Sequence, residues 1–150
     1  MRDPVRSGRP RDGTIAALGF LVGVRKLEEL VAFQLALQFK LAVYKLVRSH
    51  PAALRDFRYR DQLFDAASGG EANVAEGFDR YRAAEFRQFL SYAKSSISEA
   101  KRRVVDGVHR EYFTELDAQE ALTLDNRAAA AVTALHGSLG PFIKSPKRGP

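Results

Sequence analysis

Residues 66–80 read AASGGEANVAEGFDR, and the small side chains of this stretch indicate how two helices meet. They recur at the three- and four-residue steps of a helix: Ala66, Gly70, Asn73 and Gly77. Consecutive glycines inside a helix cost about 1 kcal/mol each relative to alanine, a cost that is tolerated where a neighbouring backbone must come close. We therefore predict a helix over residues 57–77 whose slim side packs against another helix.

Three further segments show the apolar periodicity of helices, and no run alternates as a strand would. Residues 27–50 lack glycine and proline, begin with acidic and end with basic side chains, and stop at Pro51. Asp79 is the expected N-cap of a helix whose apolar stripe runs from residue 86 to 108, and residues 116–135 form the last helix. Short connections then predict an all-α fold, an antiparallel up-down four-helix bundle.

The first predicted helix is apolar on more than one side. One side carries Leu30, Phe33, Leu37, Leu41 and Tyr44, and another carries Leu35, Phe39, Ala42 and Leu46. A helix that is apolar nearly all round is buried from several sides. In a bundle of this size, the second side predicts an interface with another subunit.

Charge divides the 150 residues into a neutral body and basic ends. Residues 1–26 and 144–150 together hold nine basic and two acidic residues, a net charge of +7, whereas residues 27–143 hold 15 basic and 16 acidic residues. We expect 27–143 to be the bundle domain, 1–26 a disordered basic leader or the product of a wrongly assigned start, and 144–150 a short basic tail. Basic ends favour contact with a polyanion, and the alternative is a merely solvated terminus.

Several classes of site are disfavoured by composition. The chain has no cysteine, which excludes disulfides and thiolate metal sites and is compatible with a reducing cytoplasm, where we expect the protein to act. The apolar run over residues 14–24 is too short to span a bilayer. His50, His109 and His136 are widely separated, so no metal site is expected. Gly69-Gly70 follows no strand and precedes no Gly-Lys-Ser/Thr, so it is no phosphate loop, and no cofactor is expected.

Asn73, Glu76 and Arg80 have residue types that catalysis uses, but a structural interpretation is favoured. A general acid or base needs a partner and a pocket, and a tight bundle offers little cavity. We expect Asn73 to bond across the helix contact to Ser96 or Glu99, Glu76 to pair with Arg80 or with another subunit, and Gly77 to end its helix. No enzymatic activity is therefore predicted.

Basic residues line the third predicted helix. Arg80, Arg87, Lys94 and Lys101 follow one another at intervals of seven, which places the last three on one face. Residues 80–110 contain eight basic and three acidic residues, whereas residues 111–143 contain five acidic residues and one arginine. One interpretation is a solvated, self-complementary surface on which the third helix pairs with the fourth, within one subunit or between subunits. The other is a nucleic-acid interface that contacts phosphates through Arg80, Arg82, Arg87, Lys94, Lys101 and Arg103. Nearby aromatic side chains that could stack on bases, but that at helical spacing are more often core, are Tyr59, Phe78, Tyr81 and Tyr92.

A family resemblance rests on three segments of the second and third predicted helices. They read Asn73-Val74-Ala75-Glu76-Gly77-Phe78, Phe86-Arg87-Gln88-Phe89-Leu90 and Ser95-Ser96-Ile97-Ser98-Glu99, with Arg80 between the first two. With LEELVAFQLA at the start of the first helix, the pattern resembles the four helix bundle protein family, whose founding members are encoded in intervening sequences of bacterial large-subunit ribosomal RNA genes. The sequence departs from the family where Gly69-Gly70-Glu71 replaces a more apolar run and where Ser95 replaces a glycine.

The resemblance carries expectations about assembly and function. It implies a non-enzymatic four-helix bundle that forms a ring-like homo-oligomer, commonly a pentamer. The accessory variability determinant protein of diversity-generating retroelements is similar in fold and works with a reverse transcriptase and RNA. We therefore expect an accessory protein that binds itself and RNA or DNA, with no membrane or small-molecule partner. The alternative is a protein–protein scaffold with no nucleic-acid role.

Overall fold

The computed structural model describes residues 24–80 and 82–143, and every regular element in these ranges is helical. The elements are η1 Leu27–Glu29, α2 Val31–Arg48, α3 Pro51–Arg55, α4 Phe57–Phe78, α5 Ala83–His109, α6 Glu115–Ser138 and η2 Gly140–Phe142. The all-α prediction is confirmed for the described part of the chain. Most of the expected basic leader, the basic tail and Tyr81 lie outside the described residues.

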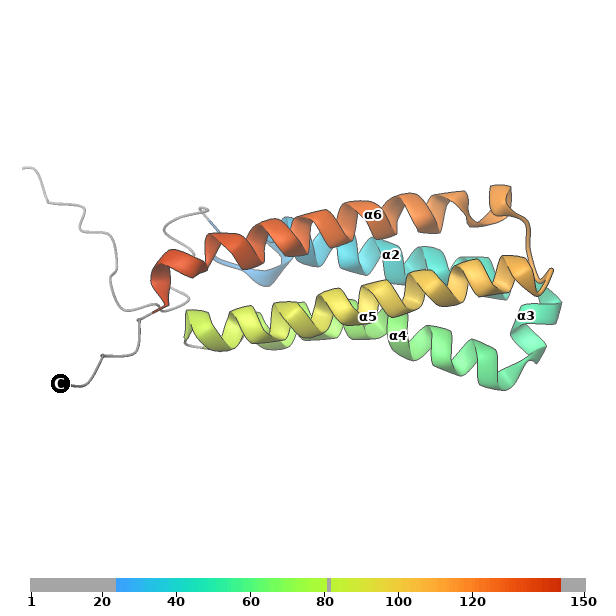
Figure 1. Cartoon of the computed structure of the whole chain (residues 1–150), viewed down its shortest axis with the longest axis horizontal. Coiled ribbons are helices and arrows are strands. Elements are labelled where there is room, and N and C mark those ends of the chain that lie inside the picture. The colour runs from blue at the N-terminus through green and yellow to red at the C-terminus, as the bar shows by residue number, and fades with distance from the viewer. Residues whose placement is uncertain (1–23, 81, 144–150) are drawn as a thin grey trace, which may run out of the picture.

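Four long helices, α2, α4, α5 and α6, lie lengthwise beside one another (Figure 1). The colours in Figure 1 show the chain reversing direction between successive long helices, with α3 at the turn between α2 and α4. Contacts join α4 to α5, α5 to α6, α6 to α2 and α2 to α4, so each long helix has two long neighbours. α5 therefore has one side against α4 and another against α6.

The first helix begins later than its sequence predicted. Residues 27–29 form a separate 3₁₀ turn, and Leu30 is extended, with φ −77° and ψ 117°. Glu28 and Glu29 therefore precede α2 rather than form its first turn. Pro51 does end the helix, but it also begins the short α3, which the sequence analysis missed. Proline suits the first turn of a helix because its ring fixes φ and no partner is needed for its missing N–H.

The core is built from one apolar stripe on each long helix. In α5 the predicted stripe is buried from Phe86 through Ile97 to Val104, and in α2 Leu35 and Phe39 are buried as expected. Burying a side chain of this size is worth about 1.5–3 kcal/mol, so these stripes hold the helices together. The second apolar side of α2 is partly covered by the described residues. Leu30 is buried and the Tyr44 ring lies 4.6 Å from the Phe64 ring, whereas Leu41 is 53% exposed. Val31, at the start of α2, is 58% exposed.

The α4–α5 contact confirms the interpretation of the small residues. A Cβ atom built on Gly70 would lie 2.7 Å from Cγ1 of Ile97, and one on Gly69 would lie 2.7 Å from the Ser96 hydroxyl oxygen. At Gly77 the nearest atom would be a ring carbon of Phe86, at 2.6 Å. No side chain fits at these distances, so glycine is what lets α5 lie directly on the α4 backbone.

Two predicted helix boundaries are wrong. Gly77 does not end its helix, because α4 continues to Phe78 and Asp79 is the C-cap. Asp79 therefore does not cap α5, which begins at Ala83 after Arg82 and has no side-chain cap. The clear side-chain caps stand elsewhere: Asp56 accepts the Tyr59 N–H at 3.1 Å, and Thr114 forms a capping box with Asp117 at the start of α6.

Gly107 also differs from its expected role. The sequence analysis took it as a sign of fraying near the end of α5, but it is buried inside the helix. A Cβ at this position would clash with the Tyr59 hydroxyl and the Phe113 ring. Gly107 therefore makes room for Tyr59 to pack against α5 near the α3 end of the molecule.

Candidate nucleic-acid interface

The six candidate phosphate contacts do not form one continuous surface. Arg87, Lys94 and Lys101, which we name the α6-side row, share a face of α5 at seven-residue spacing. Arg87 Nε donates to His136 Nδ1 at 3.3 Å, and Lys101 Nζ donates to Asn126 Oδ1 at 3.0 Å, so this face adjoins α6. Arg103 lies against α4, where it donates to Gln62 Oε1 at 2.8 Å. Arg80 and Arg82 precede α5.

The α6-side row is only partly neutralised. Lys101 Nζ lies 3.7 Å from Oδ2 of Asp125, which is 2% exposed. Burial raises the pKa of the Asp125 carboxyl, and the nearby Lys101 charge opposes that rise. Its Oδ1 has no hydrogen-bond partner in the described part of the chain. Among the described residues, no ion pair joins Arg87 or Lys94 to a carboxylate.

The pKa of His136 is affected by the positive charges at this end of the α6-side row. Burial lowers the pKa of the His136 imidazole, and the charges of Arg87 and Lys94 lower it further. Neutral histidine can accept the hydrogen bond from Arg87, whereas protonated histidine cannot. The geometry therefore keeps two cations beside a neutral ring.

The expected pairing of a basic third helix with an acidic fourth helix holds for Asp125 alone. Two other acids of α6 face α2 and its C-terminal end instead: Glu120 lies 3.6 Å from Lys45 of α2, and Asp117 lies 3.3 Å from His50, between α2 and α3. Among the described residues of one subunit this pairing is therefore mostly absent, because α6 turns these acids toward α2 and the residues that follow it. Pairing between subunits stays a prediction.

The residues of the opening motif make local contacts. Arg80 Nη2 lies 2.6 Å from Glu76 Oε1, as predicted, and its guanidinium also covers the Phe89 ring at 4.8 Å. Asn73 donates to the Gly69 carbonyl at 2.7 Å, within its own helix, so the predicted bond across to Ser96 or Glu99 is wrong. The Gly69 carbonyl, one turn earlier in α4, is within reach of the Asn73 amide without crossing to α5. Glu99 instead pairs with Arg103 at 2.9 Å.

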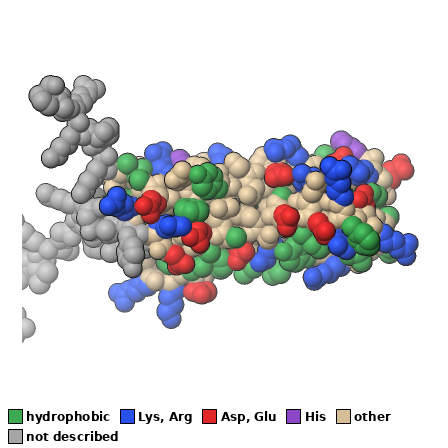
Figure 2. All heavy atoms as spheres, turned by 90° about the horizontal axis from the view of Figure 1, so that it is seen from below, with side chains coloured by type: hydrophobic (Ala, Val, Ile, Leu, Met, Phe, Trp, Pro, Cys, Tyr) green, Lys and Arg blue, Asp and Glu red, His purple; other side chains and the backbone are tan. Residues whose placement is uncertain are grey.

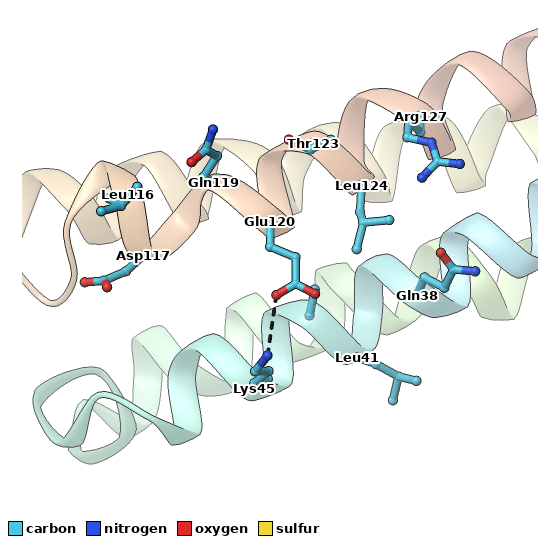
Figure 3. A pocket seen from close by; sticks show the side chains of 11 residues that line it. Gln38, Leu41, Lys45, Leu116, Asp117, Gln119, Glu120, Thr123, Leu124 and Arg127 are labelled. Carbon is cyan, nitrogen blue, oxygen red and sulfur yellow. Dashed lines mark ion pairs between the residues drawn. The ribbon is translucent and has the colours of Figure 1, made fainter.

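A shallow groove of about 770 Å³ runs between α2 and α6. Figure 3 shows Glu120 reaching from α6 toward Lys45 on α2, with Leu124 pointing into the space between the helices. Two apolar side chains along it are largely exposed, Leu41 at 53% and Leu116 at 78%. We name it the α2–α6 groove, and its charged lining residues are Lys45, Asp117, Glu120 and Arg127.

A second cavity, of about 320 Å³, lies between α4 and α5 near the α3 end. We name it the arginine pocket; it is lined by Asp56, Arg58, Tyr59, Gln62, Arg103 and Arg110. The sequence analysis included Arg103 among its candidates but missed the rest of this group as a site. Local spacing could not reveal it, because the lining comes from two helices. α4 and its N-cap contribute four of the six residues, and α5 and its C-cap contribute the other two. Tyr59, considered there for base stacking, is buried.

The charged side chains in the view of Figure 2 are mixed in sign. Lys and Arg are interspersed with Asp and Glu along the length of this face. This face is therefore not uniformly basic. In the described residues no cluster of three or more metal-ligand side chains occurs, and no helix there is long and apolar enough to cross a membrane.

One comparison with known proteins places the chain. A family model described as 23S rRNA-intervening sequence protein matches residues 28–134, which is more than two thirds of the sequence. The match begins within η1, covers α2, α3, α4 and α5, and ends before the last turn of α6. No curated protein matches the chain.

Proposed function

Because the chain belongs to the 23S rRNA-intervening sequence protein family, as its motifs predicted, we propose that it is a non-enzymatic accessory protein that binds RNA. In this proposal the four long helices form an antiparallel up-down bundle, and the bundle assembles into a homo-oligomer in the cytoplasm, with five subunits as the family resemblance implies. The observation that carries RNA binding is the pair Arg87 and Lys94, whose charges no described carboxylate neutralises by contact.

The α6-side row suits a phosphate backbone for electrostatic reasons. Arg87 and Lys94 are two turns of helix apart, about 10 Å along α5 at 1.5 Å per residue. Each can contact a different phosphate, and such contacts bind without sequence preference and weaken steeply with salt. A ring of subunits would repeat the row, so the avidity of the assembly would exceed the affinity of one chain.

The α2–α6 groove supports self-association. Leu41 of α2 and Leu116 of α6 expose apolar surface there, and Leu41 belongs to one of the two apolar sides that the sequence analysis found on the first helix. The groove carries two cations and two carboxylates, so a second copy can meet it with opposite charges. We propose that a second copy of this chain covers the groove in the oligomer.

RNA binding is tested by mobility shift with a structured RNA at two salt concentrations. Arg87→Ala and Lys94→Ala should each weaken binding and reduce the slope of log K against log salt by about 1. Arg55→Ala, which removes an exposed arginine from α3, is the matched control and should leave the slope unchanged. Absence of binding at low salt, or equal slopes for all three variants, would overturn the proposal.

Self-association is tested by measuring the mass of the protein in solution. Leu41→Glu places a charge on the apolar part of the groove and should release smaller species. Val31→Glu is the control, because Val31 is as exposed on the same helix but does not line the groove. A monomeric wild-type protein, or an oligomer indifferent to Leu41→Glu, would contradict the assignment of this face.

The exposed groove also favours a second candidate, a scaffold that binds a different protein. In that case the purified chain carries no nucleic acid and its partner binds equally at high and low salt. Leu41→Glu would then abolish partner binding, while Arg87→Ala would not affect it.

A further inference from the structure

We propose that the arginine pocket is a phosphate-binding site, separate from the α6-side row. Its lining brings three guanidinium groups, those of Arg58, Arg103 and Arg110, around a cavity of about 320 Å³. Arginine is the side chain best matched to phosphate, because its planar fork of N–H donors can bond two oxygens at once. The class of ligand is therefore a tetrahedral phosphate group, borne by a nucleotide or by the end or backbone of an RNA.

The one carboxylate in the lining stays ionised and offsets one of the three positive charges, but protein donors hold both of its oxygens. Asp56 Oδ1 accepts the Tyr59 N–H at 3.1 Å, and Oδ2 accepts the Tyr112 hydroxyl. The hydrogen bond from Tyr112 lowers the pKa of the Asp56 carboxyl, followed by the bond from Tyr59. Both oxygens are thus engaged by the protein, and Asp56 serves chiefly as the cap of α4.

The three arginines retain donors for a ligand. Arg110 gives Nε to Asp106 at 2.7 Å, and its Nη1 lies 3.6 Å from Asp56. Arg103 bonds Glu99 and Gln62, yet a guanidinium has five N–H donors. Arg58 is exposed and forms no ion pair with any residue in the described ranges. Exposed arginine–carboxylate pairs contribute little to stability, so Glu99 and Asp106 position these arginines without preventing contact with a stronger anion.

The walls of the pocket are held in place before any ligand arrives. Tyr59 is buried and its hydroxyl donates to the Arg103 carbonyl at 2.7 Å. Arg110 packs over the Tyr59 ring, 5.6 Å from the ring centre. Gly107 supplies the space that the Tyr59 hydroxyl occupies. A site already ordered loses little conformational entropy on binding, and that raises affinity for a small anion.

The pocket stands apart from the α6-side row. The row adjoins α6 through His136 and Asn126, whereas the pocket opens between α4 and α5. Loss of one site therefore need not affect the other, and the two sites can be tested with separate variants. The phosphate proposal stands on the pocket alone and does not require that the row bind RNA.

The first test measures the melting temperature of the full chain against inorganic phosphate, with sodium chloride at matched ionic strength as reference. A ligand that binds the folded state raises this temperature. We expect phosphate to raise it above chloride, and Arg58→Gln to weaken the apparent phosphate affinity about tenfold or more. Arg87→Gln makes the same charge change in the α6-side row and should keep the phosphate effect. Because Arg58 is exposed, its replacement should not prevent folding.

The second test identifies the source of the phosphate. Adenosine monophosphate and short RNA oligomers with a 5′-phosphate or a 5′-hydroxyl are titrated into wild-type protein and both variants. Tighter binding of the monophosphate identifies a nucleotide site, and tighter binding of the phosphorylated oligomer identifies an RNA end; both support the proposal. Phosphate and chloride acting equally, or equal losses in Arg58→Gln and Arg87→Gln, would overturn it. Loss of long-RNA binding in Arg87→Gln with phosphate binding intact concerns the proposed function alone.

Discussion

The two sides of α5 are held in different ways. Its side toward α4 is fixed by shape, with Ile97 and Phe86 lying directly on the glycines of α4. Its side toward α6 is fixed in part by polar groups, including the buried Asp125 and the bond from Arg87 to His136. Direct packing tolerates almost no change in volume, whereas polar contacts tolerate change in volume but respond to charge and pH. The close helix packing and the α6-side row thereby lie on different sides of one helix.

Gly70→Val should disturb the α4 side most. Even the Cβ would lie 2.7 Å from Ile97, and the added methyl groups have no space. Overpacking of a core typically costs about 1–3 kcal/mol, so we expect a loss toward the upper end of this range in denaturant unfolding. Gly137→Ala is the control, because nothing lies within 4 Å of its Cβ. It should keep stability or raise it by up to about 1 kcal/mol. Equal effects of the two substitutions would mean that α4 and α5 are not in close contact.

Gly107→Ala should have the next largest effect and act at the other end of the same side. The new Cβ would displace the Tyr59 hydroxyl and the Phe113 ring. We expect a loss of about 1–2 kcal/mol in unfolding free energy, within the usual range for such strain. The phosphate effect on melting temperature should weaken as well, because Tyr59 forms a wall of the arginine pocket. An unchanged phosphate effect would separate the pocket from this packing.

Tyr59→Phe removes one hydrogen bond and keeps the ring. The lost partner is the Arg103 carbonyl, 2.7 Å from the hydroxyl. A typical intramolecular hydrogen bond contributes about 1 kcal/mol, and we expect a loss of that size in chemical denaturation. Stability equal to wild type would show that water replaces the hydroxyl at this carbonyl without cost.

Asp125→Asn addresses the α6 side and should give the smallest effect, but one that depends on pH. Burial raises the pKa of the Asp125 carboxyl, so the folded chain holds this proton more tightly than the unfolded chain does. Stability is then lost as pH rises from the unfolded pKa, near 3.8, through the higher folded value. We expect the variant to be more stable than wild type at neutral pH, with the difference shrinking as pH falls through the folded pKa toward 3.8. Denaturant unfolding between pH 3 and 8 measures this difference. A stability difference between variant and wild type that grows toward low pH would mean that the Asp125 pKa is lowered, not raised, in the folded chain.

Sequence patterns predicted the elements better than the contacts between them. The apolar stripe of α5 and the glycine surface of α4 were visible because helix period and residue size are local properties. Helix ends were less predictable. Pro51 follows the end of α2 and also begins α3. Asp79 has a side chain suited to an N-cap, but it lies at the C-terminal end of α4 rather than at the start of α5. Asn73 was assigned a partner across the contact, but a nearer carbonyl in its own helix satisfied it.

The candidate sites show the same limit. Seven-residue spacing placed Arg87, Lys94 and Lys101 together, but it could not show that Lys101 faces a buried carboxylate while Arg87 faces an imidazole. The arginine pocket could not be predicted from the sequence, because Asp56 and Tyr112 are 56 positions apart and meet only when α4 and α5 pack.

By itself, the amino-acid sequence determined the helical class, the slim surface of residues 66–77, the basic character of α5 and the family to which the chain belongs. Those properties follow from periodicity, side-chain volume and composition, which are set along the chain. Only the tertiary structure decided which cations are neutralised, which side of α5 each one occupies and where three arginines surround a cavity. Charge neutralisation and cavities depend on distances of a few ångströms between segments far apart in the chain, and those distances are settled when the helices pack.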